Sequence, residues 1–254
     1  SAPVTNPATG QVTGQVALAS VEDAQTVINA AAAAFPDWRD TSITKRVQTL
    51  FAFRELLNAR RGELAAIITA EHGKVLSDAK GEISRGIENV EFAAGLVHLL
   101  KGEHAEQVSR GVDVHSVKQP VGVVAAITPF NFPVMVTLWM TASAIACGNA
   151  VILKGAELSP ATQGLIIDAL DAAGFPPGVV NYLTCAPEDA PALVESLIAH
   201  PAVRRVNFTG STPVGRIIAR TCGQYLKPAV LELGGKAPLL VLDDALPMPS
   251  ICLP

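Results

Sequence analysis

The spacing of apolar residues changes part-way along the chain. Over the first hundred residues they recur every three or four positions, which predicts helices at 21–35, 42–60, 62–72 and 78–100. In the last of these helices, Ile83, Ile87, Val90 and Ala94 mark the expected buried stripe. Residues 108–118 instead alternate between apolar and polar, so we expect an extended strand or a projecting arm there.

From residue 121 onward, short apolar strands alternate with helices. Strands are predicted at 121–127, 150–153, 179–183, 203–208, 229–233 and 239–242. Helices are predicted between them at 134–147, 159–173, 187–199 and 211–222. This order predicts an α/β fold with an open, doubly wound, Rossmann-like parallel sheet behind an N-terminal helical segment. Ligands of such sheets bind at the carboxyl ends of the strands.

The uncharged run from residue 119 to 153 is long enough to suggest a membrane span. Prolines, glycines and asparagines interrupt it, however, so that its longest helical piece is 134–147. We therefore predict buried strands and a buried helix, with no membrane span. The N-terminus also lacks the basic and apolar regions of a secretory signal.

Composition narrows the function classes. The chain has 254 residues, 49% of them hydrophobic, with 19 Lys+Arg against 23 Asp+Glu. This composition excludes a disordered protein, and the net charge of -4 makes nucleic acid an unlikely partner. Four cysteines and five histidines show no metal-ligand spacing, so we predict no metal site and reduced cysteines in a cytoplasmic protein.

Two of the predicted strand-to-helix turns carry polar groups suited to chemistry. Asn131 lies between two aromatic residues and two prolines, and such a stiffened carboxamide suits donation to an oxyanion. An Asx turn is the alternative. Lys154 and Glu157 could hold a ribose from both sides, and the carboxylate would repel a 2′-phosphate, which favours NAD over NADP. A solvated ion pair is the alternative there.

Two further turns complete the set. Gly210 and Ser211 begin a predicted helix whose free N–H groups could bind a pyrophosphate, although the same residues also start ordinary helices. Glu232 is flanked by leucines and followed by two glycines, so we expect burial to raise its pKa toward that of a general base. A salt bridge to Lys236 is the alternative.

In their order and spacing, the segments 129–133, 154–157, 208–215 and 232–236 closely resemble the NAD(P)-dependent aldehyde dehydrogenase superfamily, from about residue 6 to 245. The resemblance is mixed between vanillin or salicylaldehyde and methylmalonate-semialdehyde dehydrogenases. It implies that Asn131 is the oxyanion-hole residue and Glu232 the base that activates water. It implies NAD as cofactor, with the binding residues Thr128, Pro129, Phe130, Lys154, Glu157, Gly210, Ser211, Val214, Leu233 and Gly234. Gly155-Ala156 departs from the commoner Pro-Ser of the family.

The resemblance also implies a division of the chain. Residues 1–107 would be the helical part of the NAD-binding domain and 108–118 the extended arm, the oligomerisation strand on which family members dimerise. Residues 119–245 would be the Rossmann-like core and 246–254 an atypical tail. The family's nucleophilic cysteine lies in a glycine-rich segment beyond Glu232, on a separate catalytic domain. Cys252 follows Glu232 but has a proline-rich context without glycine. We therefore expect a truncated aldehyde dehydrogenase fold that lacks its catalytic domain and is inactive alone.

Three hypotheses about the function of the chain remain. The first is an aldehyde dehydrogenase that oxidises an aldehyde with NAD and water, as a homodimer or homotetramer when full length. The second is a non-catalytic nucleotide-binding or subunit-pairing module. The third is a CoA-acylating semialdehyde dehydrogenase, against which Glu232 argues because a water-activating base serves hydrolysis. Which aldehyde is used does not follow from these residues.

Overall fold

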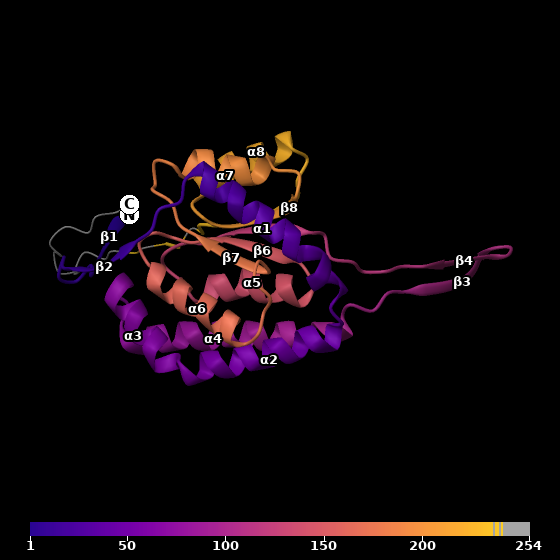
Figure 1. The fold of residues 1–254 in the computed structure, drawn as a ribbon, viewed down its shortest axis with the longest axis horizontal. Helices are drawn as coiled ribbons and strands as arrows, with labels where there is room; N and C mark the ends of the chain where they lie inside the picture. The colour runs from indigo at the N-terminus through magenta and orange to yellow at the C-terminus, as the bar shows by residue number, and fades with distance from the viewer. Residues whose placement is uncertain (236, 239, 241–254) are drawn as a thin grey trace.

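The secondary structure follows the predicted order over most of the chain (Figure 1). A computed structural model describes residues 1–235, 237–238 and 240. Its helices are α1 (Val21–Asp40), α2 (Ile43–Ala59), α3 (Arg61–His72), α4 (Leu76–Gly95), η1 (Leu96–His98), α5 (Met135–Ala146), α6 (Pro160–Ala172), α7 (Ala190–Ala199) and α8 (Thr212–Gln224). Its strands are β1 (Ala2–Thr5), β2 (Val12–Val16), β3 (His104–Ser109), β4 (Val112–His115), β5 (Val123–Ile127), β6 (Ala150–Lys154), β7 (Val180–Leu183), β8 (Val203–Gly210) and β9 (Ala229–Leu233).

A five-stranded parallel sheet with the order β7-β6-β5-β8-β9 forms the centre of the fold. The predicted doubly wound parallel sheet is thereby confirmed. After β5 the chain passes to β6 and β7 on one side, whereas β8 lies on the other side of β5 and leads to β9. The direction of winding therefore reverses between β5 and β8, and open α/β sheets bind ligands at such a reversal.

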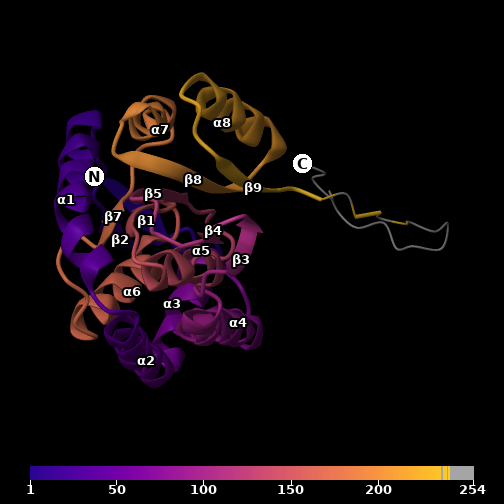
Figure 2. The same ribbon diagram turned by 90° about the vertical axis from the view of Figure 1, so that its right-hand side faces the viewer.

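Helices cover both faces of the sheet (Figure 2). On one face α1, α7 and α8 pack against alternate residues of β5, namely Val123, Ala125 and Ile127. On the other face Val124 and Ala126 of the same strand pack in a core that contains residues of α2 to α6. Alternation of neighbouring residues between two apolar layers explains why β5 is apolar throughout.

The first hundred residues contribute mainly to the second of these layers. Helix α4 packs between α5 and the pair α2 and α3, and its predicted stripe of Ile83, Ile87, Val90 and Ala94 is buried as expected. Helix α1 continues through Pro36 to Asp40, beyond the predicted end at residue 35. Trp38, in this added turn, is buried and donates from Nε1 to the Ile145 carbonyl oxygen at 3.0 Å. Tertiary packing thus overrides the local effect of proline.

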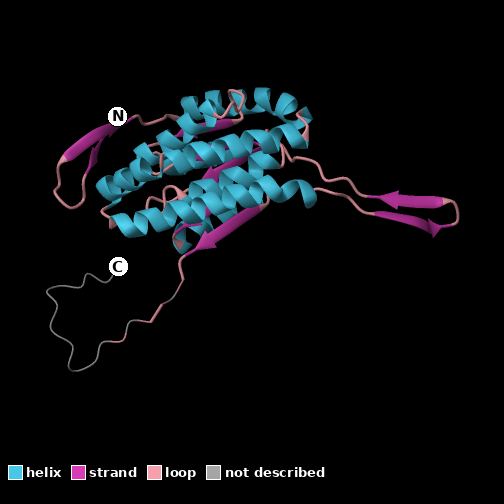
Figure 3. Ribbon diagram, turned by 90° about the horizontal axis from the view of Figure 1, so that it is seen from below, coloured by secondary structure: helices cyan, strands magenta, loops and turns pink. Residues whose placement is uncertain are grey.

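An antiparallel hairpin of β3 and β4 extends away from the body (Figures 1 and 3). All residues of both strands are exposed. The extended conformation predicted for 108–118 is therefore only the second part of a hairpin that begins at His104. Among the described residues, no helix has both the length and the apolar character needed to cross a bilayer.

Other differences from the prediction have simple causes. The hairpin of β1 and β2 was not predicted, because its residues are mostly exposed and show no apolar alternation. The last long N-terminal helix ends at Gly95 and is followed by η1, short of the predicted residue 100. Helix α7 begins at Ala190, three residues after the predicted start. The predicted strand 239–242, the tail 246–254 and Cys252 lie outside the described residues, except for Leu240, which is not in a strand.

Candidate active site

The four turns with candidate chemistry lie at one edge of the sheet. Ile127, the last residue of β5, is level with Lys154 of β6 and with Phe208 of β8. On the other side of β8, Gly210 is level with Leu233 of β9. Residues that are distant in sequence, from Thr128 to Gly234, therefore follow neighbouring strands at their carboxyl ends. Helices α5 and α8 leave β5 and β8 toward opposite faces, which places the turns of Asn131 and Ser211 on either side of the winding reversal.

A buried ion pair, which was not predicted from the sequence, contacts the backbone of the Asn131 turn. Lys74, just after α3, lies with its Nζ 2.7 Å from Oε2 of Glu82 in α4, and the two side chains are 7% and 0% exposed. The same Nζ donates to the Asn131 carbonyl oxygen at 2.8 Å and lies 3.9 Å from the centre of the Phe132 ring. The backbone of Asn131 is thereby bonded directly to the lysine.

The other carboxylate oxygen of Glu82 fixes the start of α5. Oε1 accepts from the backbone N–H groups of Val134 at 2.9 Å and Met135 at 3.2 Å. A carboxylate at this position satisfies helix N–H groups that have no partner within the helix, and it interacts favourably with the helix dipole. Glu82 therefore joins α4, Lys74 and the turn that follows Asn131 into one fixed unit.

The carboxamide of Asn131 remains available. Asn131 is exposed, and among the described residues its side chain has no hydrogen-bond partner. Among the described residues the Asn131 side chain makes no hydrogen bond to the backbone, so the Asx turn considered as an alternative is not formed there; Lys74 and Glu82 fix the backbone instead. Fixed backbone with a free N–H donor at a strand end is the arrangement that a preorganised oxyanion site needs.

Helix N-termini at this edge differ in whether a side chain already binds them. Helix α5 has Glu82, and at the start of α6 the Ala161 N–H donates to Glu71, whose pKa burial raises to about 7. Ser211 is the N-cap of α8, yet its side chain makes no capping hydrogen bond. The first turn of α8 therefore keeps N–H groups and a hydroxyl that are free for an anion.

Two features of α8, the close packing of Gly215 and the exposure of Val214, fit a nucleotide site. A Cβ on Gly215 would lie 2.4 Å from Leu233 Cδ2, so this glycine lets α8 approach β9 closely. Val214, in the first helical turn, is 44% exposed and offers an apolar surface beside the helix N-terminus.

Lys154 and Glu157 face each other across the turn after β6. Lys154 Nζ lies 3.9 Å from Glu157 Oε2, too far for a direct hydrogen bond, and the side chains are 11% and 21% exposed. The pair is largely buried, which argues against the solvated ion pair considered as an alternative. Its spacing leaves both groups available to a hydroxyl-bearing ligand.

The three described cysteines do not provide an activated thiol. Cys147, Cys185 and Cys222 are free, and burial raises the pKa of each thiol. A nucleophilic cysteine needs the opposite shift, toward the thiolate. Among the described residues there is also no cluster of His, Cys, Asp and Glu able to hold a metal ion.

The similarity of this chain to known proteins identifies its family. Residues 1–247 match the aldehyde dehydrogenase family. The chain belongs to this family. It is 46% identical to a malonate-semialdehyde dehydrogenase of Pseudomonas aeruginosa over 96% of its own length and 48% of the relative. It is also 46% identical to a vanillin dehydrogenase of a Pseudomonas species over 94% of its length and 50% of that relative.

Solved aldehyde dehydrogenase structures agree with the fold. The methylmalonate-semialdehyde dehydrogenase of Oceanimonas doudoroffii is 46% identical with a TM-score of 0.88, and covers 92% of this chain and 47% of its own. A salicylaldehyde dehydrogenase of Pseudomonas putida G7, complexed with salicylaldehyde, is 35% identical with a TM-score of 0.90, over 96% of this chain and 50% of its own. The chain thus spans about half the length of these aldehyde dehydrogenases.

One expectation for this aldehyde dehydrogenase chain is wrong in the described structure. Glu232 was expected to be buried, but it is exposed, as is Gly234 after it. In β9, Leu231 and Leu233 are half-buried, whereas Val230 and Glu232 between them are exposed. The strand lies at the edge of the sheet. Lys236, the partner in the alternative salt bridge, lies outside the described residues.

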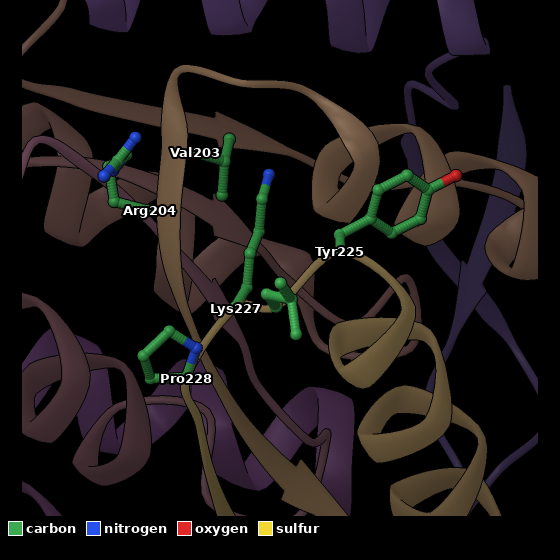
Figure 4. Close-up of a pocket in the computed structure, with 6 residues that line it drawn as sticks. Val203, Arg204, Tyr225, Lys227 and Pro228 are labelled. Carbon is green, nitrogen blue, oxygen red and sulfur yellow. The ribbon is translucent and has the colours of Figure 1, made fainter.

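A hollow of about 220 Å³ lies at the amino ends of β8 and β9, away from the carboxyl ends that carry the candidate active site (Figure 4). Val203 and Arg204 at the start of β8 line it together with Tyr225–Pro228, which precede β9. None of the residues expected to bind a cofactor or substrate of an aldehyde dehydrogenase lines this hollow. It is therefore separate from the candidate active site.

Lys74 and Glu82 were missed by the sequence analysis, although one signal for Glu82 was present. Glu82 falls on the buried stripe of α4, since it precedes Gly86 and Val90 at intervals of four residues. A carboxylate on an apolar stripe requires a buried partner. No comparable pattern marked Lys74, whose role depends on contacts across 57 residues of sequence.

Proposed function

We propose that this chain is the NAD-binding portion of an NAD-dependent aldehyde dehydrogenase, which converts an aldehyde, NAD and water to a carboxylic acid and NADH. One observation carries the proposal: the uncapped N-terminus of α8 and the fixed Asn131 turn follow adjacent strands at the winding reversal. An anion site and an oxyanion donor thus share one edge of the sheet, where α/β folds bind nucleotides.

The side chains present fit NAD. Ser211, after Gly210, and the free N–H groups of α8 suit its pyrophosphate, and exposed Val214 suits the adenine. Lys154 and Glu157 suit the adenosine ribose, and the Glu157 carboxylate disfavours a 2′-phosphate. We assign the remaining contacts at this edge to Thr128, Pro129, Phe130, Leu233 and Gly234. Bound NAD would supply the acceptor for the hydride that leaves the aldehyde carbon.

Two residues of this chain would act on the substrate. The Asn131 carboxamide would donate a hydrogen bond to the substrate oxygen as negative charge develops on it. Glu232 would accept a proton from the water that releases the acid. The nucleophilic thiol is not among the described cysteines, all of which have raised pKa values. We therefore expect this chain to bind NAD but to produce no NADH from an aldehyde by itself.

Assembly and location belong to the same proposal. The fully exposed hairpin of β3 and β4 suits pairing with a second subunit, which supports a homodimer or homotetramer for the complete enzyme. The free cysteines Cys147, Cys185 and Cys222 support a cytoplasmic location. The division into residues 1–107, 108–118, 119–245 and 246–254 remains our proposal for the domain organisation, with the start of the arm moved to His104, where β3 begins.

A second candidate is a CoA-acylating semialdehyde dehydrogenase. It is favoured by the 46% identity to a protein named malonate-semialdehyde dehydrogenase. Glu232 favours hydrolysis instead, because a base that activates water is not needed when CoA accepts the acyl group. NADH formation by the complete enzyme that depends on added CoA would support the second candidate.

Calorimetric titration with NAD tests the cofactor assignment on this chain. We expect NAD to bind more tightly than NADP, and Lys154→Met to weaken NAD binding by about ten- to a hundredfold, since hydrogen bonds to charged groups are worth about 1.5–3 kcal/mol. Lys80→Met, which removes an exposed lysine of α4, is the matched control and should bind NAD normally. Absence of NAD binding, or equal loss in both variants, would contradict the proposal.

A further inference from the structure

The turn that carries Lys154 and Glu157 has no side chain at position 155, and a side chain from α6 occupies the vacant place. A Cβ built on Gly155 would lie 2.0 Å from Oε1 of Gln163 and 2.6 Å from Cε2 of Tyr182. Both distances are far shorter than any van der Waals contact. The carboxamide of Gln163 therefore stands where the first atom of a residue-155 side chain would be.

Gln163 is fixed in this position from its other end. The residue is fully buried, and its Nε2 donates to Oγ1 of Thr128 at 2.9 Å and to Oγ1 of Thr137 at 3.2 Å. Thr128 begins the loop that contains Asn131, and its N–H donates to the Lys154 carbonyl oxygen at 3.1 Å. Gln163 thus connects the turn after β6 with the loop after β5.

The oxygen of the same carboxamide has no hydrogen-bond partner among the described residues. A buried acceptor without a donor costs free energy. Hydrogen bonding of Oε1 therefore does not explain why it lies against Gly155. Shape does explain it, because the carboxamide fills the space that the glycine leaves.

We propose that Gln163 is a positioning residue for the nucleotide site, which sets the conformation of the Lys154–Glu157 turn in place of a side chain at position 155. This inference rests on the proposed NAD-binding function. Gly155 and Gln163 act as a matched pair: the glycine leaves room for the carboxamide, and the carboxamide supports the turn and ties it to Thr128. The turn and the Asn131 loop are thereby held in one relative position.

A double-mutant cycle on this chain tests the pair, with NAD and AMP as ligands and calorimetry as the readout. AMP reports on the adenosine half of the site, without the nicotinamide half. In Gly155→Ala the new methyl group collides with Gln163, so we expect affinity for both ligands to fall on the order of tenfold. Gln163→Ala removes the support and should weaken both ligands by a few-fold.

The decisive variant combines the two changes. With Gln163→Ala in place, the methyl group introduced at position 155 enters the space that the carboxamide has left, and the half-buried Tyr182 can shift to make room for it. Gly155→Ala should therefore raise nucleotide affinity in the Gln163→Ala background, although it lowers affinity in the wild type. A mutation that merely destabilised the fold would not reverse its sign in this way.

Gly164→Ala is the matched control. Gly164 follows Gln163 in α6, and a Cβ there would meet no atom within 4 Å, so this variant should bind NAD and AMP normally. Melting temperatures without ligand report on folding of each variant. If Gly155→Ala does not fold, the comparison of Gln163→Ala with the double variant still decides, because only the proposed pairing makes the double variant the tighter binder.

Two failures can be told apart. If the wild-type chain binds neither NAD nor AMP, the proposed function is wrong, and so is the ligand named for this site. If the wild type binds both ligands, but affinity is unchanged by Gly155→Ala or is no higher in the double variant than in Gln163→Ala, the role of Gln163 is wrong and the proposed function stands.

Discussion

Asn131 and Glu232, the two residues expected to act on substrate, lie in very different surroundings. The Asn131 turn is bonded to Lys74, whose partner Glu82 is fully buried and caps α5. Glu232 lies on the edge strand β9 and is exposed, with no hydrogen bond to its side chain among the described residues. One residue is positioned by contacts among the described residues, and the other is not.

This difference indicates which contacts position each residue: contacts among the described residues for Asn131, and contacts outside them for Glu232. A preorganised oxyanion donor needs a fixed backbone, and Lys74 and Glu82 supply it at Asn131. A general base at neutral pH needs surroundings that disfavour its charge, and an exposed carboxylate lacks them. We infer that Glu232 acquires its working environment from a surface outside the described residues.

Removing Glu82 should affect stability far more than removing Glu232. Glu82→Ala leaves the Lys74 ammonium without its partner and the N–H groups of Val134 and Met135 unbonded. Loss of one member of a buried ion pair costs about 3–5 kcal/mol. Glu232→Ala should change the free energy of unfolding by less than about 0.5 kcal/mol, because the side chain is exposed.

Denaturant titration of both variants measures this difference. Equal losses in the two variants would show that the Asn131 turn is no better fixed than the end of β9.

Kinetics of the complete enzyme should separate Asn131 from Glu232 by reaction step. Asn131→Ala should slow the first burst of NADH about a hundredfold, since one oxyanion donor is worth about 10²–10³ in rate. Glu232→Gln should slow release of the acid more than the burst, because it removes the base for water. Rapid-mixing measurements of NADH distinguish the two phases. Loss of both phases to the same extent in Glu232→Gln would contradict the assigned role.

His72 provides a smaller, pH-dependent effect on the Asn131 side. Its ring lies 5.9 Å from the Phe130 ring, and burial, with the charge of Lys74, lowers its pKa below the usual 6.5. The unfolded chain then binds more protons at this residue than the folded chain. Its contribution to stability is complete above about pH 6.5 and is lost as pH falls toward the lowered value.

Unfolding free energies at several pH values check this prediction. Between pH 7 and 5, wild type should lose more stability than His72→Gln, which cannot gain the proton. Identical pH dependence in both would mean that His72 keeps its ordinary pKa.

The sequence predicted the centre of the sheet well because β5 and β6 are buried on both sides. Strands such as β5 and β6 have no polar residue until Lys154, and the apolar stripe of α4 has the helical period. Exposed elements were missed for the opposite reason, as the hairpin of β1 and β2 shows. Local pattern carries information about burial and little about surface strands.

The site was predicted less completely, for two different reasons. Lys74 reaches Asn131 only because α4 packs against both α3 and α5, a tertiary arrangement that no local pattern specifies. Glu232 could have been placed correctly. Its leucine neighbours at 231 and 233 suggest burial, yet alternation along a strand turns the residue between two inward-facing leucines outward.

The most direct measurement follows the backbone amide signals of the isotope-labelled chain by NMR while NAD is added. The account predicts that signals from Lys154 to Glu157 and from Gly210 to Val214 shift, together with those of the Asn131 turn. Residues around the hollow at the other edge, Arg204 and Lys227, should keep their positions. Shifts confined to Arg204 and Lys227, or no shift at saturating NAD, would contradict the assignment of a nucleotide site to the carboxyl edge of the sheet.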